Sequence, residues 1–352
     1  MLVNSYILIF KLMYNQMKKW LKINTTFLIS SLLILGSFNY FMDPLWCFQH
    51  KNFLQSKREG FNERQQKINL LHFNNQNYQG LILGSSRVTV HQGRTFYPLK
   101  ILNLAADGMQ PYEFEGYIQY AKMIHKSDLD YIILGLDLLP AGISDDDYNI
   151  TTYINNSNAY FYRYKMLLSN DATEISVKNF RNSFFHRYKK RFKTYDEDHI
   201  AATYSKAPAE VEKIVKNYVA IIKNEKMSYK RDKYIQILTQ LKKNNPNTKF
   251  IIFTTPLPEP ILNTLLQDQN NKDLYDQWLY DITKIFGSVY HFCYSNDITK
   301  DYQNTFVDEG HYTTEVGNCI NNKIFNLPCK LNGSDDFGKL LTIEKFNLMV
   351  EK

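Results

Sequence analysis

Residues Leu81 to Val90 read LILGSSRVTV, and this stretch carries the clearest signal of the fold. An aliphatic run ends at Gly84, and two serines and an arginine follow before the chain turns apolar again. An apolar run that ends in glycine and small polar residues is typical of a buried strand followed by a turn. The turn is either an ordinary strand-to-loop junction or one that presents a serine nucleophile.

Further strands are predicted on the C-terminal side of this stretch. The apolar runs are ILNL (101–104), LDYIILGLDLL (129–139), NTKFIIFTTPLP (247–258) and SVYHFCY (288–294), and segments with helical periodicity lie between them. Strands that alternate with helices favour a parallel sheet. We therefore expect an α/β fold, a three-layer sandwich with a central parallel sheet, together with one N-terminal transmembrane helix and a helical insertion.

The same pattern gives the domain boundaries. The core domain is expected over residues 78–331, with a polar, Tyr-rich insertion at 141–230 and a C-terminal tail at 332–352 on the surface. A basic cluster, Arg187 to Lys193, lies within the insertion. It is either a solvated face or a binding site for an anionic ligand.

The N-terminal region predicts a membrane anchor. Lys18, Lys19 and Lys22 precede an apolar stretch at 23–41, which is close to the roughly 20 residues that a membrane helix needs. No small-x-small cleavage site follows, which favours an uncleaved anchor over a signal peptide. A buried core helix is the alternative.

The basic residues also predict an orientation. Positive charge before the apolar stretch favours a cytoplasmic position for residues 1–22 and places the rest of the chain on the other side of the membrane. That part begins with a juxtamembrane connector at 42–77. We expect a single-pass protein of the cytoplasmic membrane with its catalytic domain extracytoplasmic. Trp20, Tyr40 and Trp46 are expected at the membrane interfaces.

Composition excludes several classes of protein. The chain is 44% hydrophobic with a net charge of +7, and it carries no nucleic-acid-binding signature. Its eight histidines form no HxH or HExxH pattern, so we expect no metal and no cofactor. The four cysteines form no CxxC pair. Cys319 and Cys329 either pair in an oxidising compartment or remain buried thiols.

Residues that could carry chemistry follow the predicted strands. In a doubly wound sheet, ligands bind at the carboxyl ends of the strands. Ser86 follows one strand, and Asp308 and His311 lie in the loop before the last helix. A serine needs a base to take its proton, and His311 could serve with Asp308 holding its imidazole. Taken alone, Asp308 and His311 could equally begin a capped helix.

A serine nucleophile also needs donors for the developing oxyanion. The backbone N–H of Ser86 is one candidate. Gly108 is a second, because a residue without a side chain lets its N–H approach a ligand closely. Gly108 could also be an ordinary turn glycine.

The order of these motifs resembles the SGNH (GDSL-like) hydrolase superfamily. The motifs are GSS (84–86), N-x-x-x-x-G (103–108), G-x-D (135–137) and D-x-x-H (308–311), and the resemblance covers about 78–139 and 248–325. It implies that Ser86 is the nucleophile and that His311 and Asp308 complete the triad. It also implies that Gly108 and Ser86 form the oxyanion hole.

Two positions depart from the family pattern. Ser85 stands where the family has aspartate, and Asp137 stands at or near the asparagine that donates an amide to the oxyanion. An ionised carboxylate cannot donate and would repel an oxyanion. Asp137 is therefore protonated, or points elsewhere, or the hole has two donors.

GSS behind a single anchor resembles a subset of this superfamily that includes the D-alanyl transfer proteins of teichoic acid synthesis and the alginate O-acetylation proteins. That resemblance implies serine-dependent O-acyl transfer, with acetyl as the expected group, or ester hydrolysis on a cell-envelope polysaccharide. The partner is then the polysaccharide or an acylated glycan and, for transfer, a separate multi-pass membrane acyl donor. The alternatives are a plain esterase and a non-catalytic member that binds glycan or scaffolds a synthesis complex.

Overall fold

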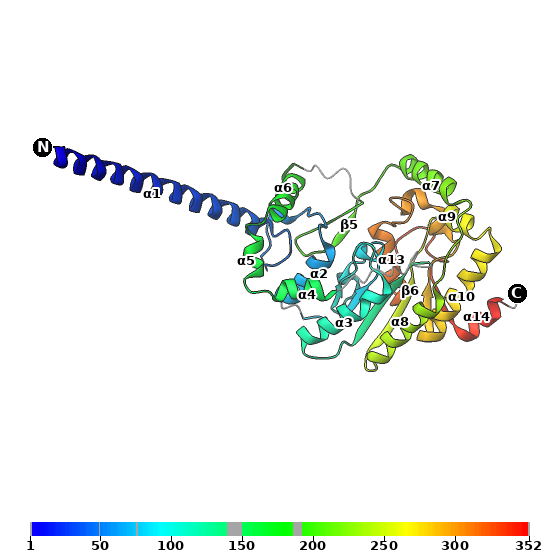
Figure 1. The fold of residues 1–352 in the computed structure, drawn as a ribbon. Coiled ribbons are helices and arrows are strands. Elements are labelled where there is room, and N and C mark those ends of the chain that lie inside the picture. The colour runs from blue at the N-terminus through cyan, green and yellow to red at the C-terminus, as the bar shows by residue number, and fades with distance from the viewer. Residues whose placement is uncertain (1, 49, 75–76, 139–149, 186–191, 351–352) are drawn as a thin grey trace.

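A six-stranded sheet forms the centre of a mixed α/β domain. The computed structural model describes residues 2–48, 50–74, 77–138, 150–185 and 192–350 (Figure 1). The sheet has the order β2-β1-β3-β6-β7-β8. Its strands are β1 (Gly80–Leu83), β2 (Ile101–Asn103), β3 (Tyr131–Leu136), β6 (Lys249–Thr254), β7 (Ser288–His291) and β8 (Lys339–Thr342).

The sheet is parallel except at one edge. β1 pairs in parallel with β2 and β3, β3 with β6, and β6 with β7, whereas β8 runs antiparallel to β7. The tail therefore does not lie wholly on the surface as we expected from its polar composition, because it supplies this edge strand. Leu341 within this strand is buried, and so are Phe337 before it and Phe346 after it.

Helices flank the sheet and connect its strands. α3, α8 and α10 pack side by side, and α13 follows the loop that carries His311. The helices outside the insertion are α2 (Glu63–Phe73), α3 (Pro111–His125), α8 (Arg231–Asn244), α9 (Glu259–Leu265), α10 (Gln269–Phe286), α11 (Asp297–Lys300), α12 (Tyr302–Thr305), α13 (Thr314–Ile324) and α14 (Ile343–Val350). Short 3-10 turns are η1 (Phe53–Gln55), η2 (Val88–Val90) and η3 (Gly93–Phe96).

In its described part, residues 150–185 and 192–230, the insertion contains four helices and a two-stranded ribbon. They are α4 (Ile150–Asn158), α5 (Tyr162–Met166), α6 (Asn170–Phe185), β4 (Lys193–Tyr195), β5 (Ala201–Thr203) and α7 (Pro208–Ile222). α7 buries Val211 and Val215 in the main core, so the insertion is partly integral to the domain. The basic cluster lies outside the described residues except for its end, Phe192 and Lys193.

The N-terminal helix α1 (Leu2–Met42) extends well beyond the domain (Figure 1). Within the described residues, Phe10–Met42 is the one stretch long and apolar enough to cross a membrane. The helix is longer than the predicted span 23–41, because the basic residues before that span are also helical. The expected interfacial position of Trp46 is wrong: Trp46 is fully buried and packs edge-on against Tyr195.

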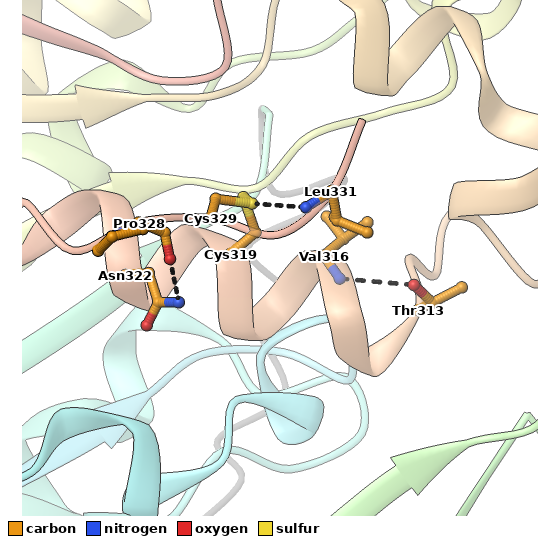
Figure 2. Close-up of a disulfide and its surroundings, with 7 residues drawn as sticks. All are labelled: Thr313, Val316, Cys319, Asn322, Pro328, Cys329 and Leu331. Atoms are coloured by element: carbon orange, nitrogen blue, oxygen red, sulfur yellow. Dashed lines mark hydrogen bonds between the residues drawn. A yellow bond between two sulfur atoms is a disulfide. The ribbon is translucent and has the colours of Figure 1, made fainter. Parts of the chain in front are cut away.

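A disulfide joins Cys319 on α13 to Cys329 in the loop that follows it (Figure 2). Nearby, the Asn322 side chain donates a hydrogen bond of 3.0 Å to the carbonyl of Pro328. Of the two readings of these cysteines, the structure has the paired one. Cys47 and Cys293 are free and buried. The disulfide therefore ties the segment leading to β8 to the helix that follows His311.

Candidate active site

Ser86, His311 and Asp308 form one hydrogen-bonded chain. Ser86 Oγ lies 2.8 Å from His311 Nε2, although 225 residues separate the two. His311 Nδ1 lies 2.9 Å from both carboxylate oxygens of Asp308. With Nδ1 donating to Asp308, Nε2 is left as the acceptor that a serine proton requires. The three residues predicted as a triad thus meet in the order that nucleophilic catalysis needs.

Asp308 also organises the loop that carries the histidine. Its Oδ1 accepts the backbone N–H groups of Gly310 (2.9 Å) and His311 (2.7 Å). Burial would raise the pKa of Asp308, but the hydrogen bonds and charge of His311 and the two backbone N–H groups hold it below its usual value. Asp308 therefore remains an anion beside the imidazole.

The turn that holds Ser86 is fixed by glycine and by a side-chain amide. A Cβ on Gly84 would lie 2.4 Å from Val88 Cγ2 and 2.8 Å from the carbonyl oxygen of Gly135, so only glycine fits. Asn103, at the end of β2, donates to the carbonyls of Val88 (2.9 Å) and His91 (2.8 Å). These contacts close the turn after β1 and hold Ser86 at the edge of the sheet.

Two donors for an oxyanion are available near Ser86. Among the described residues, no acceptor takes a hydrogen bond from the backbone N–H of Ser86 or of Gly108. Gly108 has a positive φ of 63°, and a Cβ there would meet no atom within 4 Å. Both residues line the same cavity. The predicted pair of donors is therefore free to bind a ligand.

Two residues of α2 hold the peptide units on either side of Asp107, and the second of these units carries the Gly108 N–H. Arg64 donates to the carbonyl of Asp107 (3.0 Å), which is the oxygen of the peptide unit that carries the Gly108 N–H. Glu63 accepts the N–H of Asp107 at 2.8 Å. Arg64 is itself fixed by a two-pronged contact with Glu113 at 2.7 and 2.9 Å. The N–H is thereby oriented and polarised from behind.

A buried charge cluster supports this arrangement. Glu63 receives hydrogen bonds or ion-pair contacts from Lys193 and Tyr195, each at 2.8 Å. Burial alone would raise the pKa of Glu63, but the Lys193 and Lys67 charges and the Tyr195 hydroxyl lower it to about 2. Burial lowers the pKa of Lys67 to about 7 despite the nearby Glu63 carboxylate. Glu63 is thus a permanent anion behind the Asp107–Gly108 loop.

Asp137 is engaged by neighbours other than a substrate. Its Oδ1 accepts from Thr255 Oγ1 at 2.7 Å, and its Oδ2 lies 3.4 Å from Arg87 Nη1. Arg87 is held in turn by the carbonyl of Gly310, which accepts from its Nε at 2.9 Å. Of the three readings of Asp137, this geometry fits a carboxylate that is turned toward a cation, which leaves two backbone donors for an oxyanion.

A cavity of about 500 Å³ opens over these groups. Ser86, Gly108 and His311 line it, and the rest of its lining is mixed in polarity, with polar side chains such as Glu225, Lys226 and Ser228. The apolar members of the lining include Met109, Phe114, Leu257, Ile261 and Leu265. Phe192, from the insertion, stacks on the His311 ring with 3.9 Å between centroids. The cavity thus brings the Ser86–His311–Asp308 contacts together with a lining of mixed polarity.

No protein-family model and no curated protein matches this chain. The superfamily resemblance therefore rests on the four sequence motifs alone. In the part of the chain that the structure describes, no group of three or more His, Cys, Asp or Glu side chains could hold a metal ion.

Sequence reasoning missed several residues of the site. Arg87 directly follows the nucleophile in GSSR, and this adjacency was the one signal that could have marked it. Arg64 and Glu63 lie in the connector, and nothing in their local sequence distinguishes them from solvated surface residues, because their contacts depend on long-range packing. Phe192 and Lys193 belong to the basic cluster that the sequence marked, but neither of its two interpretations predicted a stacking contact with His311 or an ion pair with Glu63.

Proposed function

We propose that this protein is a membrane-anchored serine acyltransferase or esterase with an SGNH-like domain. The observation that carries the proposal is the contact of Ser86 with His311 at 2.8 Å and of His311 with Asp308 at 2.9 Å. The strand order β2-β1-β3-β6-β7 supports a three-layer, doubly wound arrangement in which the site lies at the reversal of strand order beside β1 and β3.

The first half-reaction forms an acyl-serine. His311 Nε2 takes the Ser86 proton as Oγ attacks the acyl carbonyl carbon. The carbonyl oxygen becomes an anion that accepts the Ser86 and Gly108 N–H groups. The bond to the leaving oxygen then breaks, and His311 returns the proton to that oxygen. Asp308 stabilises the imidazolium in between.

The second half-reaction releases the acyl group. A hydroxyl of an acceptor glycan, or water, gives its proton to His311 and attacks the acyl-serine carbonyl. Collapse of this intermediate breaks the bond to Ser86 Oγ, which regains a proton from His311. A glycan acceptor makes the protein a transferase, and water makes it an esterase. The acyl group, with acetyl as the expected one, would come from a separate multi-pass membrane donor in the transferase case.

The compartment is proposed on independent grounds. α1 is long and apolar enough to span a membrane, and Lys18, Lys19 and Lys22 favour a cytoplasmic N-terminus. The Cys319–Cys329 disulfide suits an oxidising compartment outside the cytoplasm. The substrate class proposed from this location is a cell-envelope polysaccharide. A reporter fused after residue 352 that works only outside the cytoplasm should be active, and activity of a cytoplasm-only reporter would contradict this topology.

A fluorophosphonate probe tests the chemistry directly, because only an activated serine reacts. The purified chain should take up one probe, Ser86→Ala should take up none, and Ser85→Ala serves as the matched control that retains labelling. Asp137 favours one rival, a non-catalytic glycan-binding or scaffolding protein, because a carboxylate lines the cavity. An unlabelled wild-type chain that still binds glycan would support this rival.

A further inference from the structure

The last turns of α1 are built into the insertion. Asn39 donates hydrogen bonds to the carbonyl of Leu167 and to Thr173 Oγ1, each at 2.8 Å. Phe38 meets Phe180 of α6 edge-on, with 6.1 Å between ring centroids. Figure 1 shows α5 and α6 on either side of the point where α1 enters the domain. The two helices therefore form a collar around the end of the anchor.

An apolar groove runs beside the apolar part of α1, next to these contacts. Side chains from 29–41 of α1 and from 164–168 line one apolar groove of about 460 Å³. At 1.5 Å per residue, Ile29 lies about 20 Å from the end of α1 at Met42. Half of the hydrocarbon core of a bilayer is about 15 Å thick. If the apolar stretch 23–41 of α1 spans the membrane, the groove that residues 29–41 line cannot lie wholly above the bilayer.

The outward surface of the collar is apolar where it borders α1. Large side chains stand exposed at both helices, including Phe161 with 57% of its surface exposed and Phe184 with 56%. The remaining exposed members of this surface are Tyr160, Tyr164, Leu168 and Phe185. Aromatic side chains concentrate at membrane interfaces, whereas a water-facing surface rarely gathers so many of them.

We propose that residues 160–168 and 184–185, the membrane seat, rest in the outer leaflet beside α1. The occupant of this surface is phospholipid, with acyl chains in the groove and headgroups at its upper rim. Phospholipid is preferred to a protein partner because the groove is continuous with the surface of α1, which must face lipid if α1 spans. The proposal depends on that span and is independent of the chemistry at Ser86.

Spin labels on the full chain in phospholipid nanodiscs test the seat. A cysteine introduced at a surface site is the one to be labelled, because Cys319 and Cys329 are bonded and Cys47 and Cys293 are buried. Phe161→Cys and Phe184→Cys probe the seat. Ile221→Cys is the control, because it is 76% exposed on α7, far from α1 (Figure 1). Tyr160→Cys replaces either seat position if that variant does not fold.

The readout is the ratio of label collisions with O₂, which concentrates in lipid, to collisions with a water-soluble nickel chelate. The seat positions should give a ratio several-fold higher than Ile221→Cys. Equal ratios at seat and control would overturn the proposal, as would a chain that does not remain with the disc. Spin–spin broadening that disappears on dilution with unlabelled chain would assign the surface to a second copy and would also overturn it.

Discussion

Asp308→Asn separates the chemistry of the site from its architecture. Asp308 Oδ1 accepts two backbone N–H groups of its loop, and both of its oxygens face His311 Nδ1. An asparagine oxygen can keep the two backbone bonds, but its NH₂ must then face Nδ1. Nδ1 becomes an acceptor, the proton moves to Nε2, and Nε2 can no longer take the Ser86 proton.

The two consequences differ greatly in size. Loss of the correct tautomer should slow activation of Ser86 by about 10⁴-fold, or roughly 5 kcal/mol in the barrier. The folded state should lose only about 1–2 kcal/mol, since two charge-assisted hydrogen bonds become neutral ones. Asp308→Ala, which removes the acceptor altogether, should cost more stability because two backbone N–H groups of the loop lose their partner.

The assay is the second-order rate of fluorophosphonate labelling, followed by intact mass, with urea unfolding measured on the same samples. Asp308→Asn should label about 10⁴-fold more slowly while unfolding near the wild-type midpoint. Labelling at the wild-type rate would refute the assignment of His311 Nε2 as the base. A collapse of stability in Asp308→Asn, equal to that of Asp308→Ala, would refute the separation of the two roles.

Three further predictions follow from individual contacts. Asp137→Asn keeps an acceptor for Thr255 and removes a negative charge from the cavity. Fluorophosphonate labelling of this variant should therefore rise on the order of tenfold to a hundredfold. A fall in labelling would mean that the Arg87–Asp137 pair is needed for activity. Cys319→Ser should lower the free energy of unfolding by about 2–3 kcal/mol, and reductant should lower that of the wild type equally while leaving the variant unchanged. Burial lowers the pKa of His91 to about 4, against 6.5 when unfolded, so the unfolded state takes up the proton first as pH falls. The stabilisation from neutral His91 is complete above pH 6.5 and should be lost between pH 6.5 and 4, by about 3 kcal/mol. His91→Gln should remove that share of the pH dependence of urea-unfolding stability, while His291 and His199, whose pKa values burial also lowers, keep their own shares.

The strand pattern predicted the residues that meet at the strand ends. Ser86, Asp308 and His311 could be paired in advance because the carboxyl ends of parallel strands share one edge. The antiparallel strand β8 could not be predicted from the sequence, because KLLT is short and its partner β7 is distant in sequence. Trp46 was misplaced for a related reason: an aromatic after an apolar helix looks the same whether it faces headgroups or a domain core.

The residues that hold the loop of Gly108 could not be predicted from the sequence either. Arg64 reaches the Asp107 carbonyl across 43 positions, and Lys193 reaches Asp107 across 86. Each lies in a polar segment whose composition is equally compatible with a solvent-exposed position and with a buried ion pair. Only the three-dimensional packing of α2 and the ribbon against the sheet distinguishes the two environments.

The position of α2 determines where the shortest fragment that keeps the site intact must begin. A fragment that began at residue 78, the boundary suggested by the first strand, would retain Ser86, Gly108, Asp308 and His311 but would lack Glu63 and Arg64. The Asp107–Gly108 peptide would then lose the Arg64 contact to its carbonyl, the Asp107 N–H would lose its acceptor on Glu63, and the buried Glu113 would lose its arginine partner. A fragment that keeps the site intact therefore has to begin before α2, and a fragment cut closer to the sheet would present the Ser86 site without the contacts that hold the Gly108 loop.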